Sequence, residues 1–268
     1  MKKLTLLLLL LLIPTLEARQ ATPQSIVEEL LAADRAFSVA SGKSDVINGL
    51  SAMFADEVTL TYAGGIAAGK ADATEALRQN KANAGARIEW TPLRAAISGD
   101  GRHGFTAGVM TLRTAKAPPS LTPLANVLPA KLVDGTKDAA LVERYRKSLA
   151  DAETAFSDEA QKIGTGPAFA MFGSPEALNL GGPDVPTFVI GNQAIGEAVG
   201  GGEPPNGSRV RWGPDVKTIV AASGDFGVTI GHIFPNAPGP DGKPQPGRPF
   251  FTIWHRANPG APWRYIAE

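Results

Sequence analysis

The spacing of apolar residues predicts alternating helical and extended segments. Over residues 26–38 the apolar side chains recur every three or four positions, which is typical of an amphipathic helix. Over residues 58–62 they alternate, which is typical of a half-buried strand. The elements predicted for the first half are a helix over 26–38, a short helix ending near 54, a hairpin over 58–69, a helix over 70–79, and long strands over 87–98 and 103–113.

The second half has the same order and continues further. Its predicted elements are a helix over 138–163, a strand over 188–190, a helix over 193–199, and strands over 209–223, 228–234, 250–256 and 263–267. Helices followed by antiparallel strands predict an α+β fold class. Residues 235–249 form a long segment rich in Pro, Gly, Asn and Asp, and loops of that length are usually mobile or functional.

Several short motifs occur twice in the same order. Ala33-Asp34-Arg35-Ala36-Phe37-Ser38 returns as Ala152-Glu153-Thr154-Ala155-Phe156-Ser157, and Trp90-Thr91-Pro92 returns as Trp212-Gly213-Pro214. Ser98-Gly99-Asp100 returns as Ser223-Gly224-Asp225. We interpret this order as a tandem duplication with a repeat of about 120 residues, the size of a small domain.

The first half lacks the last two strands of the second. Nothing between Arg113 and Asp134 has the pattern of a Trp-bearing strand or a tight hairpin. A sheet cut short exposes unpaired backbone groups, so something must cover it. The apolar residues between 121 and 133 predict an irregular covering segment within residues 116–137, and a homodimer contact is the alternative.

Composition and the N-terminus restrict the classes of function. Lys2 and Lys3 precede an apolar run up to Leu16, which predicts a signal peptide over residues 1–21 and an exported protein, periplasmic or secreted. That run is short for a membrane span, so no membrane contact is expected after cleavage. The 26 basic and 26 acidic residues balance, so no nucleic-acid partner is expected. With no cysteine, disulfides and thiol catalysis are excluded.

The helix motif Ala-Asp-Arg-Ala-Phe-Ser, the Trp-x-Pro strand start and the Ser-Gly-Asp turn together resemble the NTF2-like superfamily, in particular its DUF4440/SnoaL-like branch. The closing sequence Phe251-Thr252-Ile253-Trp254-His255-Arg256 followed by Trp263-Arg264-Tyr265-Ile266 resembles that family's last hairpin. The resemblance implies two cone-shaped units, each a curved antiparallel sheet over helices, covering residues 22–115 (truncated) and 138–268. Such a fold hosts both enzymes and binding proteins.

Three functions remain open. We expect foremost a small-molecule binding or accessory protein, with an apolar or aromatic ligand in a pocket of the second unit. A cofactor-free isomerase, cyclase or dehydratase that uses general acid–base residues is the alternative. A third interpretation is a protein–protein scaffold that binds through the loop over residues 235–249.

Candidate site residues follow from the strands of the second half. His232 and His255 lie on consecutive predicted strands, where they would be near neighbours able to transfer protons. Asp215 and Tyr265 are the other catalytic candidates, by analogy with a carboxylate base paired with a hydrogen-bond donor. No third ligand accompanies the histidines, so neither a metal nor another cofactor is predicted. The residues predicted to line a ligand pocket are Trp212, Trp254, Trp263, Arg211 and Arg256.

Overall fold

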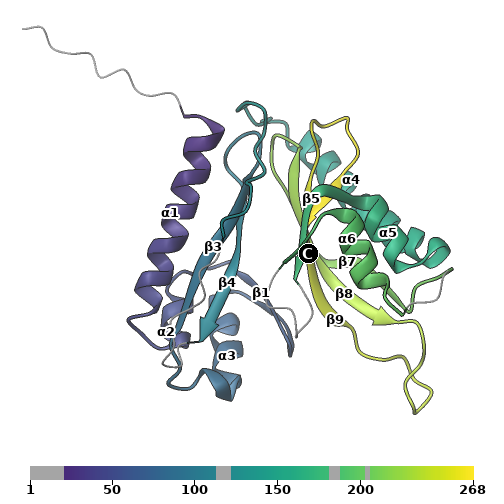
Figure 1. Ribbon diagram of the computed structural model, residues 1–268, viewed down its shortest axis with the longest axis horizontal. Helices are drawn as coiled ribbons and strands as arrows, with labels where there is room; N and C mark the ends of the chain where they lie inside the picture. The colour runs from purple at the N-terminus through teal and green to yellow at the C-terminus, as the bar shows by residue number, and fades with distance from the viewer. Residues whose placement is uncertain (1–20, 113–121, 181–187, 203–205) are drawn as a thin grey trace, which may run out of the picture.

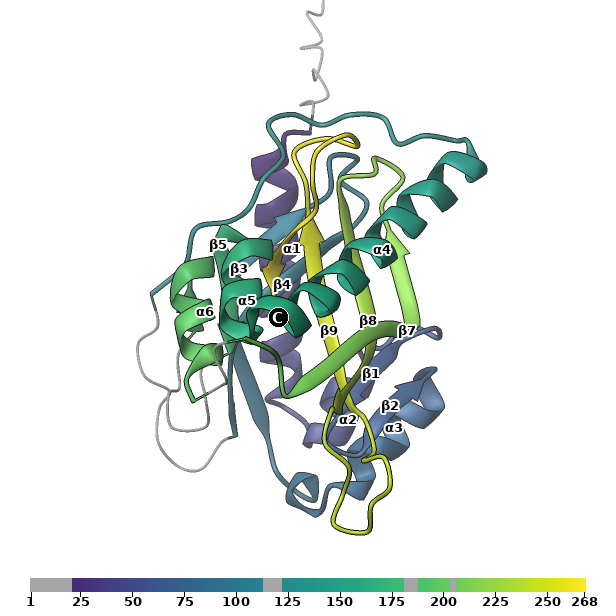
Figure 2. The ribbon, with the colours of Figure 1, turned by 90° about the vertical axis from the view of Figure 1, so that its right-hand side faces the viewer.

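The computed structural model describes residues 21–112, 122–180, 188–202 and 206–268. Residues 1–20, which hold nearly all of the predicted signal peptide, lie outside these ranges. The described chain is α+β and forms four layers, which are a helix, a two-stranded sheet, a six-stranded curved sheet and a second group of helices (Figures 1 and 2). Within these ranges, no helix has the length and apolar character that a bilayer span requires.

The first half begins with α1 (Pro23–Ser41), whose N-cap Thr22 forms a capping box with Ser25. Its remaining elements are α2 (Val46–Ser51), the hairpin β1 (Thr59–Tyr62) and β2 (Gly65–Ala68), α3 (Lys70–Gln79), a 3₁₀ turn η1 (Lys81–Asn83), and the antiparallel pair β3 (Ile88–Ile97) and β4 (Gly104–Leu112). One face of β3 packs Ala95 and Ile97 against Val27 of α1. The helix and strand periodicities of the sequence are therefore confirmed in this half.

The second half contains the large sheet. Its elements are α4 (Ala139–Ile163), α5 (Thr165–Phe172), β5 (Gly173–Leu180), β6 (Phe188–Ile190), α6 (Asn192–Gly200), β7 (Val210–Val220), β8 (Phe226–Pro235), β9 (Arg248–His255) and β10 (Arg264–Ala267). The strand order is β6-β5-β10-β9-β8-β7, with β10 parallel to β5 and the other pairs antiparallel. Helix α4 crosses one face of this sheet (Figure 2).

Two elements of the second half were not predicted. The segment that follows Gly164 forms α5, and β5 follows it directly at Gly173. α5 is mostly apolar and largely buried, so it lacks the polar face that reveals an amphipathic helix in a sequence. Pro175 and Glu176 interrupt the apolar alternation that would have marked β5 as a strand.

The segment after β4 runs along the free edge of β3. The Leu124 amide donates to the Leu93 carbonyl at 2.7 Å, the Val127 amide donates to the Ala95 carbonyl at 3.0 Å, and Ala96 forms a parallel bridge with Val127. Leu128 and Leu132 pack onto the cluster between β3 and α1. This part of the chain thus covers the edge of the short sheet, which is the intrachain arrangement that the sequence left open beside a homodimer.

The two halves face each other sheet to sheet. Ala96, Phe105 and Ala107 of the first half lie in one apolar cluster with Phe226, Ile253 and other residues of the large sheet. At one end the two Ser-Gly-Asp turns exchange hydrogen bonds. The Gly99 amide donates to Asp225 Oδ2 at 2.8 Å, and the Ser223 amide donates to Asp100 Oδ2 at 3.2 Å. The halves therefore form a single packed body.

Candidate functional site

The structure brings two of the predicted catalytic residues together. A bulge in β7 between Gly213 and Lys217 pushes Asp215 towards β8. Its Oδ1 accepts the His232 backbone N–H at 2.9 Å, and both carboxylate oxygens lie 3.1 Å from His232 Nδ1. Both side chains keep part of their surface exposed, at 29% for His232 and 48% for Asp215. A carboxylate that orients an imidazole in this way leaves Nε2 to face a ligand.

His255 lies far from this pair. The β8–β9 register places His232 opposite Pro249 and His255 opposite Phe226, so six residues of strand separate the two histidines, about 20 Å. Burial lowers the pKa of His255, and the nearby carboxylates of Asp225 and Glu176 oppose that shift. The prediction that the two histidines are near neighbours is therefore wrong. Two consecutive strands can pair in a register that places their histidines at opposite ends of the pair.

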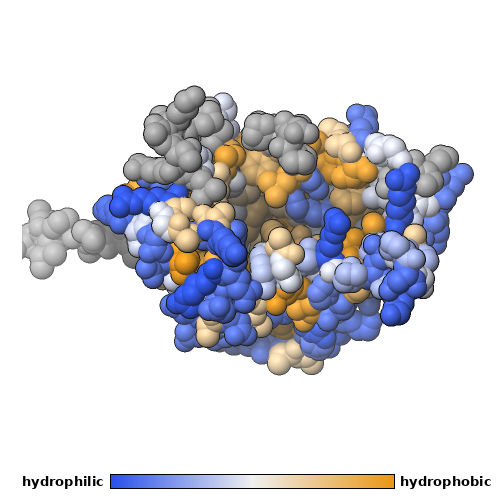
Figure 3. Space-filling model, turned by 90° about the horizontal axis from the view of Figure 1, so that it is seen from below, coloured by the Kyte–Doolittle hydropathy of each residue, from blue (hydrophilic) through white to orange (hydrophobic). Residues whose placement is uncertain are grey.

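A crevice lies where the β1–β2 hairpin of the first half meets β9. Its volume is about 500 Å³, and the described residues that line it are Thr61, Tyr62, Ala63, Arg248 and Pro249. Pro249 is the register partner of His232, so the histidine and the crevice share one end of the same sheet face. The molecule is hollowed on the side seen from below, and apolar residues line the hollow (Figure 3). Sequence analysis missed this site because it requires contact between segments almost 190 residues apart.

Most of the predicted pocket residues, and the catalytic candidate Tyr265, are instead packed inside the second half. Trp212, Trp254 and Tyr265 surround Phe156, with ring centroids 4.9, 6.2 and 5.7 Å from it. Tyr265 is fully buried and donates its hydroxyl to the Phe169 carbonyl at 2.9 Å. Burial raises the pKa of the Tyr265 phenol. Aromatic rings with satisfied polar atoms in mutual contact form a core, and these three hold the sheet onto α4.

The polar centre of that core is Glu153, which sequence analysis named only as part of the repeat. Its carboxyl is fully buried and accepts the indole N–H of Trp212 at 2.7 Å and that of Trp254 at 3.0 Å. The Thr229 hydroxyl bonds to the same carboxyl. Burial raises the pKa of Glu153 although these donors oppose the shift. The signal in the sequence is the recurrence of an acid one helical turn before Ser38 and again before Ser157.

A second acid lies near Glu153. Burial raises the pKa of Glu268 well above its usual value, and the charge of Glu153 adds to that rise. Glu268 is partly exposed as a whole residue, but its Oε2 atom is buried and has no hydrogen-bond partner. Burial is thus the main cause of the raised pKa of both carboxyls, and the charge of Glu153 adds to the rise at Glu268.

The remaining predicted ligand contacts separate into two places. Arg256 lies over the rings of Trp263 and Tyr145, at 4.1 and 5.5 Å, and donates to the Gly224 carbonyl at 2.6 Å. Burial lowers the pKa of Arg256. Arg211 is exposed and lies 5.9 Å from the ring of Phe234, the residue two positions after His232. Arg256 and Trp263 therefore stabilise a turn, whereas Arg211 belongs to the His232 end of the sheet.

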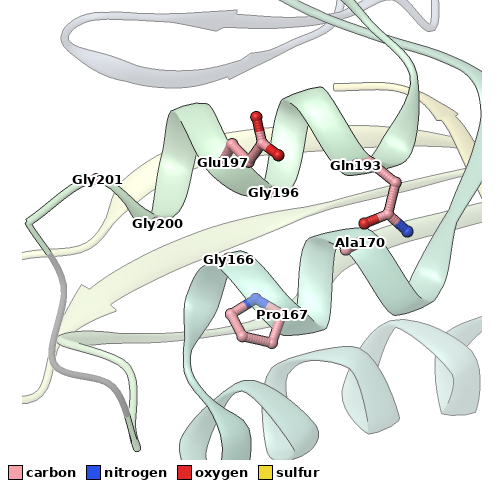
Figure 4. Close-up of a pocket in the computed structure, with 8 residues that line it drawn as sticks. All are labelled: Gly166, Pro167, Ala170, Gln193, Gly196, Glu197, Gly200 and Gly201. Carbon is pink, nitrogen blue, oxygen red and sulfur yellow. The ribbon is translucent and has the colours of Figure 1, made fainter.

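A second hollow, of about 420 Å³, lies between α5 and α6. In Figure 4 the side chain of Gln193 lies beside Ala170, and the carboxylate of Glu197 points away from α5. The helices approach closely because a Cβ on Gly196 would lie 2.6 Å from the Gly166 carbonyl oxygen. The hollow follows from this small-residue contact between helices. Glu197 is the one charged residue among the described residues that line it, and its carboxylate points away from α5.

In the described ranges, no group of three or more His, Cys, Asp or Glu side chains is arranged to hold a metal ion. The polar side chains of the described residues that line the crevice are a guanidinium, a phenol and a hydroxyl.

Comparisons with known proteins add little to this description. No family model matches the chain, and no curated protein matches it. Among solved structures, the chain is similar to a protein of Xanthomonas campestris described as a calcium/calmodulin-dependent protein kinase II association domain. The two are 12% identical, the alignment covers 50% of this chain and 85% of that chain, and the TM-score is 0.27. A similarity at that level carries no argument about fold or function.

Proposed function

We propose that this protein binds a small molecule in the crevice between the β1–β2 hairpin and β9. The crevice is the observation that carries the proposal, because about 500 Å³ lies within the range of small-molecule sites. It also joins apolar walls with a few polar groups, as such sites do. The crevice takes the place of the pocket that the sequence predicts inside the second unit, because Trp212, Trp254 and Tyr265 pack together in the core there.

The architecture that we propose is a tandem pair of NTF2-like units of the DUF4440/SnoaL-like branch, exported to the periplasm or the medium. Equivalent hydrogen bonds in the two halves support the duplication. The Trp90 indole donates to Asp34 at 2.6 Å, as the Trp212 indole donates to Glu153. The crevice between the halves would then be a site that a single unit does not possess.

An enzyme that uses general acid–base chemistry is a second candidate, and the His232–Asp215 pair favours it. The carboxylate would hold one tautomer of the imidazole, and Nε2 would accept a proton from a bound substrate. Substitution of His232 by Gln would abolish turnover in such an enzyme. A binding protein would retain most of its affinity after the same substitution.

Native mass spectrometry of the gently purified mature protein tests the proposal. We expect an added mass of a few hundred daltons per chain, within the range that a crevice of this size accommodates. Ala63→Trp should remove that mass, because Ala63 is exposed and its enlarged side chain would fill the crevice without disturbing the core. Ala140→Trp, at an exposed position at the start of α4, is the matched control. A ligand that persists in Ala63→Trp would show that it binds elsewhere.

A further inference from the structure

The charge of the crevice indicates the class of its ligand. Of the five described residues that line it, Arg248 alone is charged. Arg248 is exposed and has no carboxylate partner among the described residues, in contrast to Arg146, which pairs with Glu143. An unpaired guanidinium beside a concave surface is suited to two parallel hydrogen bonds to a carboxylate.

The walls of the crevice are suited to a flat apolar body. The phenol ring of Tyr62 and the ring of Pro249 supply rigid apolar surface, and Ala63 leaves room between them. The Thr61 hydroxyl adds one group that can donate or accept a hydrogen bond. Rigid walls of this kind favour a planar ring over a flexible chain, because little conformational freedom is lost on binding.

The imidazole of His232 lies at the same end of the sheet face as Pro249 of the crevice. The Asp215 carboxylate holds His232 at Nδ1, so Nε2 is the ring nitrogen that remains for a ligand on this sheet face. No described residue forms a hydrogen bond with Nε2. A neutral imidazole held in this way accepts at Nε2, so the groups of the crevice that can donate to an anion are the Arg248 guanidinium, the Tyr62 phenol and the Thr61 hydroxyl.

We propose that the crevice binds a small carboxylic acid with a planar aromatic body. The Arg248 guanidinium would hold the carboxylate, and Tyr62 and Pro249 would enclose the ring. A single guanidinium matches one carboxylate better than a phosphate, whose second charge would require a further cation. This inference rests on the proposed binding function and makes it specific.

Calorimetric titration with 2-naphthoate, in parallel with the neutral 2-naphthamide, tests the ligand class. We expect 2-naphthoate to bind, 2-naphthamide to bind at least about tenfold more weakly, and added salt to weaken only the acid. Arg248→Gln should weaken 2-naphthoate about tenfold or more and leave 2-naphthamide unchanged. Arg35→Gln removes the same charge from an exposed position on α1 and should change neither affinity.

The outcomes separate this inference from the function on which it rests. Equal affinity for acid and amide, with both lost in Ala63→Trp, would overturn acid recognition and retain a binding crevice. An affinity for 2-naphthoate that falls equally in Arg248→Gln and Arg35→Gln would overturn it as well. No binding of either probe would overturn the ligand class. The native mass spectrum of the protein and of Ala63→Trp would still decide the binding function.

Discussion

The two halves of this protein use the same hydrogen bond in different surroundings. In each half an acid on the long helix accepts an indole N–H, and a serine one turn later bonds to the backbone of the same tryptophan. Asp34 and Trp90 do so at a partly exposed position, whereas Glu153 and Trp212 do so at the centre of a core. The hydrogen bond is the same in both halves, but its loss should lower the free energy of unfolding more in the second half.

The difference arises from the strands that only the second half has. Thr229 on β8 and Trp254 on β9 give Glu153 two further donors and exclude water from it. In the described part of the first half β4 is the last strand, and there Asp34 receives no donor from a third strand and remains partly exposed. A buried acid depends on every one of its partners, while an exposed acid can exchange a partner for water.

Removal of the two acids should change the free energy of unfolding more than any other substitution that we consider. Glu153→Ala should lower the free energy of unfolding by about 3–5 kcal/mol, because the buried indole N–H of Trp212 loses its acceptor, that of Trp254 keeps only the Thr229 hydroxyl, and a cavity forms. Asp34→Ala should lower it by about 1 kcal/mol. Urea denaturation measures both. Equal losses in the two halves would show that burial does not set the difference.

Substitutions in the two Ser-Gly-Asp turns should give a smaller difference in stability between the halves. Asp225 is nearly buried and accepts from the Gly99 amide and the Ser223 hydroxyl, whereas Asp100 is more exposed. Asp225→Asn should cost about 1–2 kcal/mol and Asp100→Asn about 0.5–1 kcal/mol. The double variant, also measured in urea, should lose less than the sum, because both substitutions loosen the same pair of turns. Additive losses would mean that the two turns act independently.

The smallest expected effect is the dependence of stability on pH. Burial raises the folded pKa of Glu153 above the usual value of a glutamate, so the folded state binds more protons than the unfolded state at pH values between the two. The contribution of Glu153 is therefore present below about pH 4.5 and is lost as the pH rises through the elevated folded pKa. Denaturation at several pH values should show a shallower decline in Glu153→Gln, and a shallower one still when Glu268→Gln is added. Identical slopes in the three proteins would contradict this assignment.

The sequence predicted elements better than it predicted their contacts. The helix over residues 70–79 and the strand over 188–190 match the structure at both ends, because periodicity and flanking glycines are local signals. The α5–β5 segment was missed, because a largely buried helix has no polar face to reveal it. Element type depends on neighbours along the chain, whereas burial on all sides depends on the fold.

The candidate site was predicted in part. The sequence names Asp215 and His232 among the catalytic candidates, and a bulge that no sequence pattern marks brings these two side chains into contact. Trp212 and Trp254 were taken for pocket walls, since a sequence does not distinguish a tryptophan facing a cavity from one facing another ring. Tyr62 and Arg248 were not named, because the hairpin and β9 meet only in the folded chain.

The hydrogen bonds between the two Ser-Gly-Asp turns also determine how early the two halves can pack together during synthesis. Gly99 leaves the ribosome 126 residues before its partner Asp225, a delay of roughly 6–25 s at ordinary rates of synthesis. The edge of β3 stays uncovered for a shorter time, until residues 124–127 have been synthesised. During this interval the face of the early sheet that will meet the later one is open to other nascent chains. A chaperone that holds such surfaces would therefore be needed earliest by the half that carries the smaller sheet.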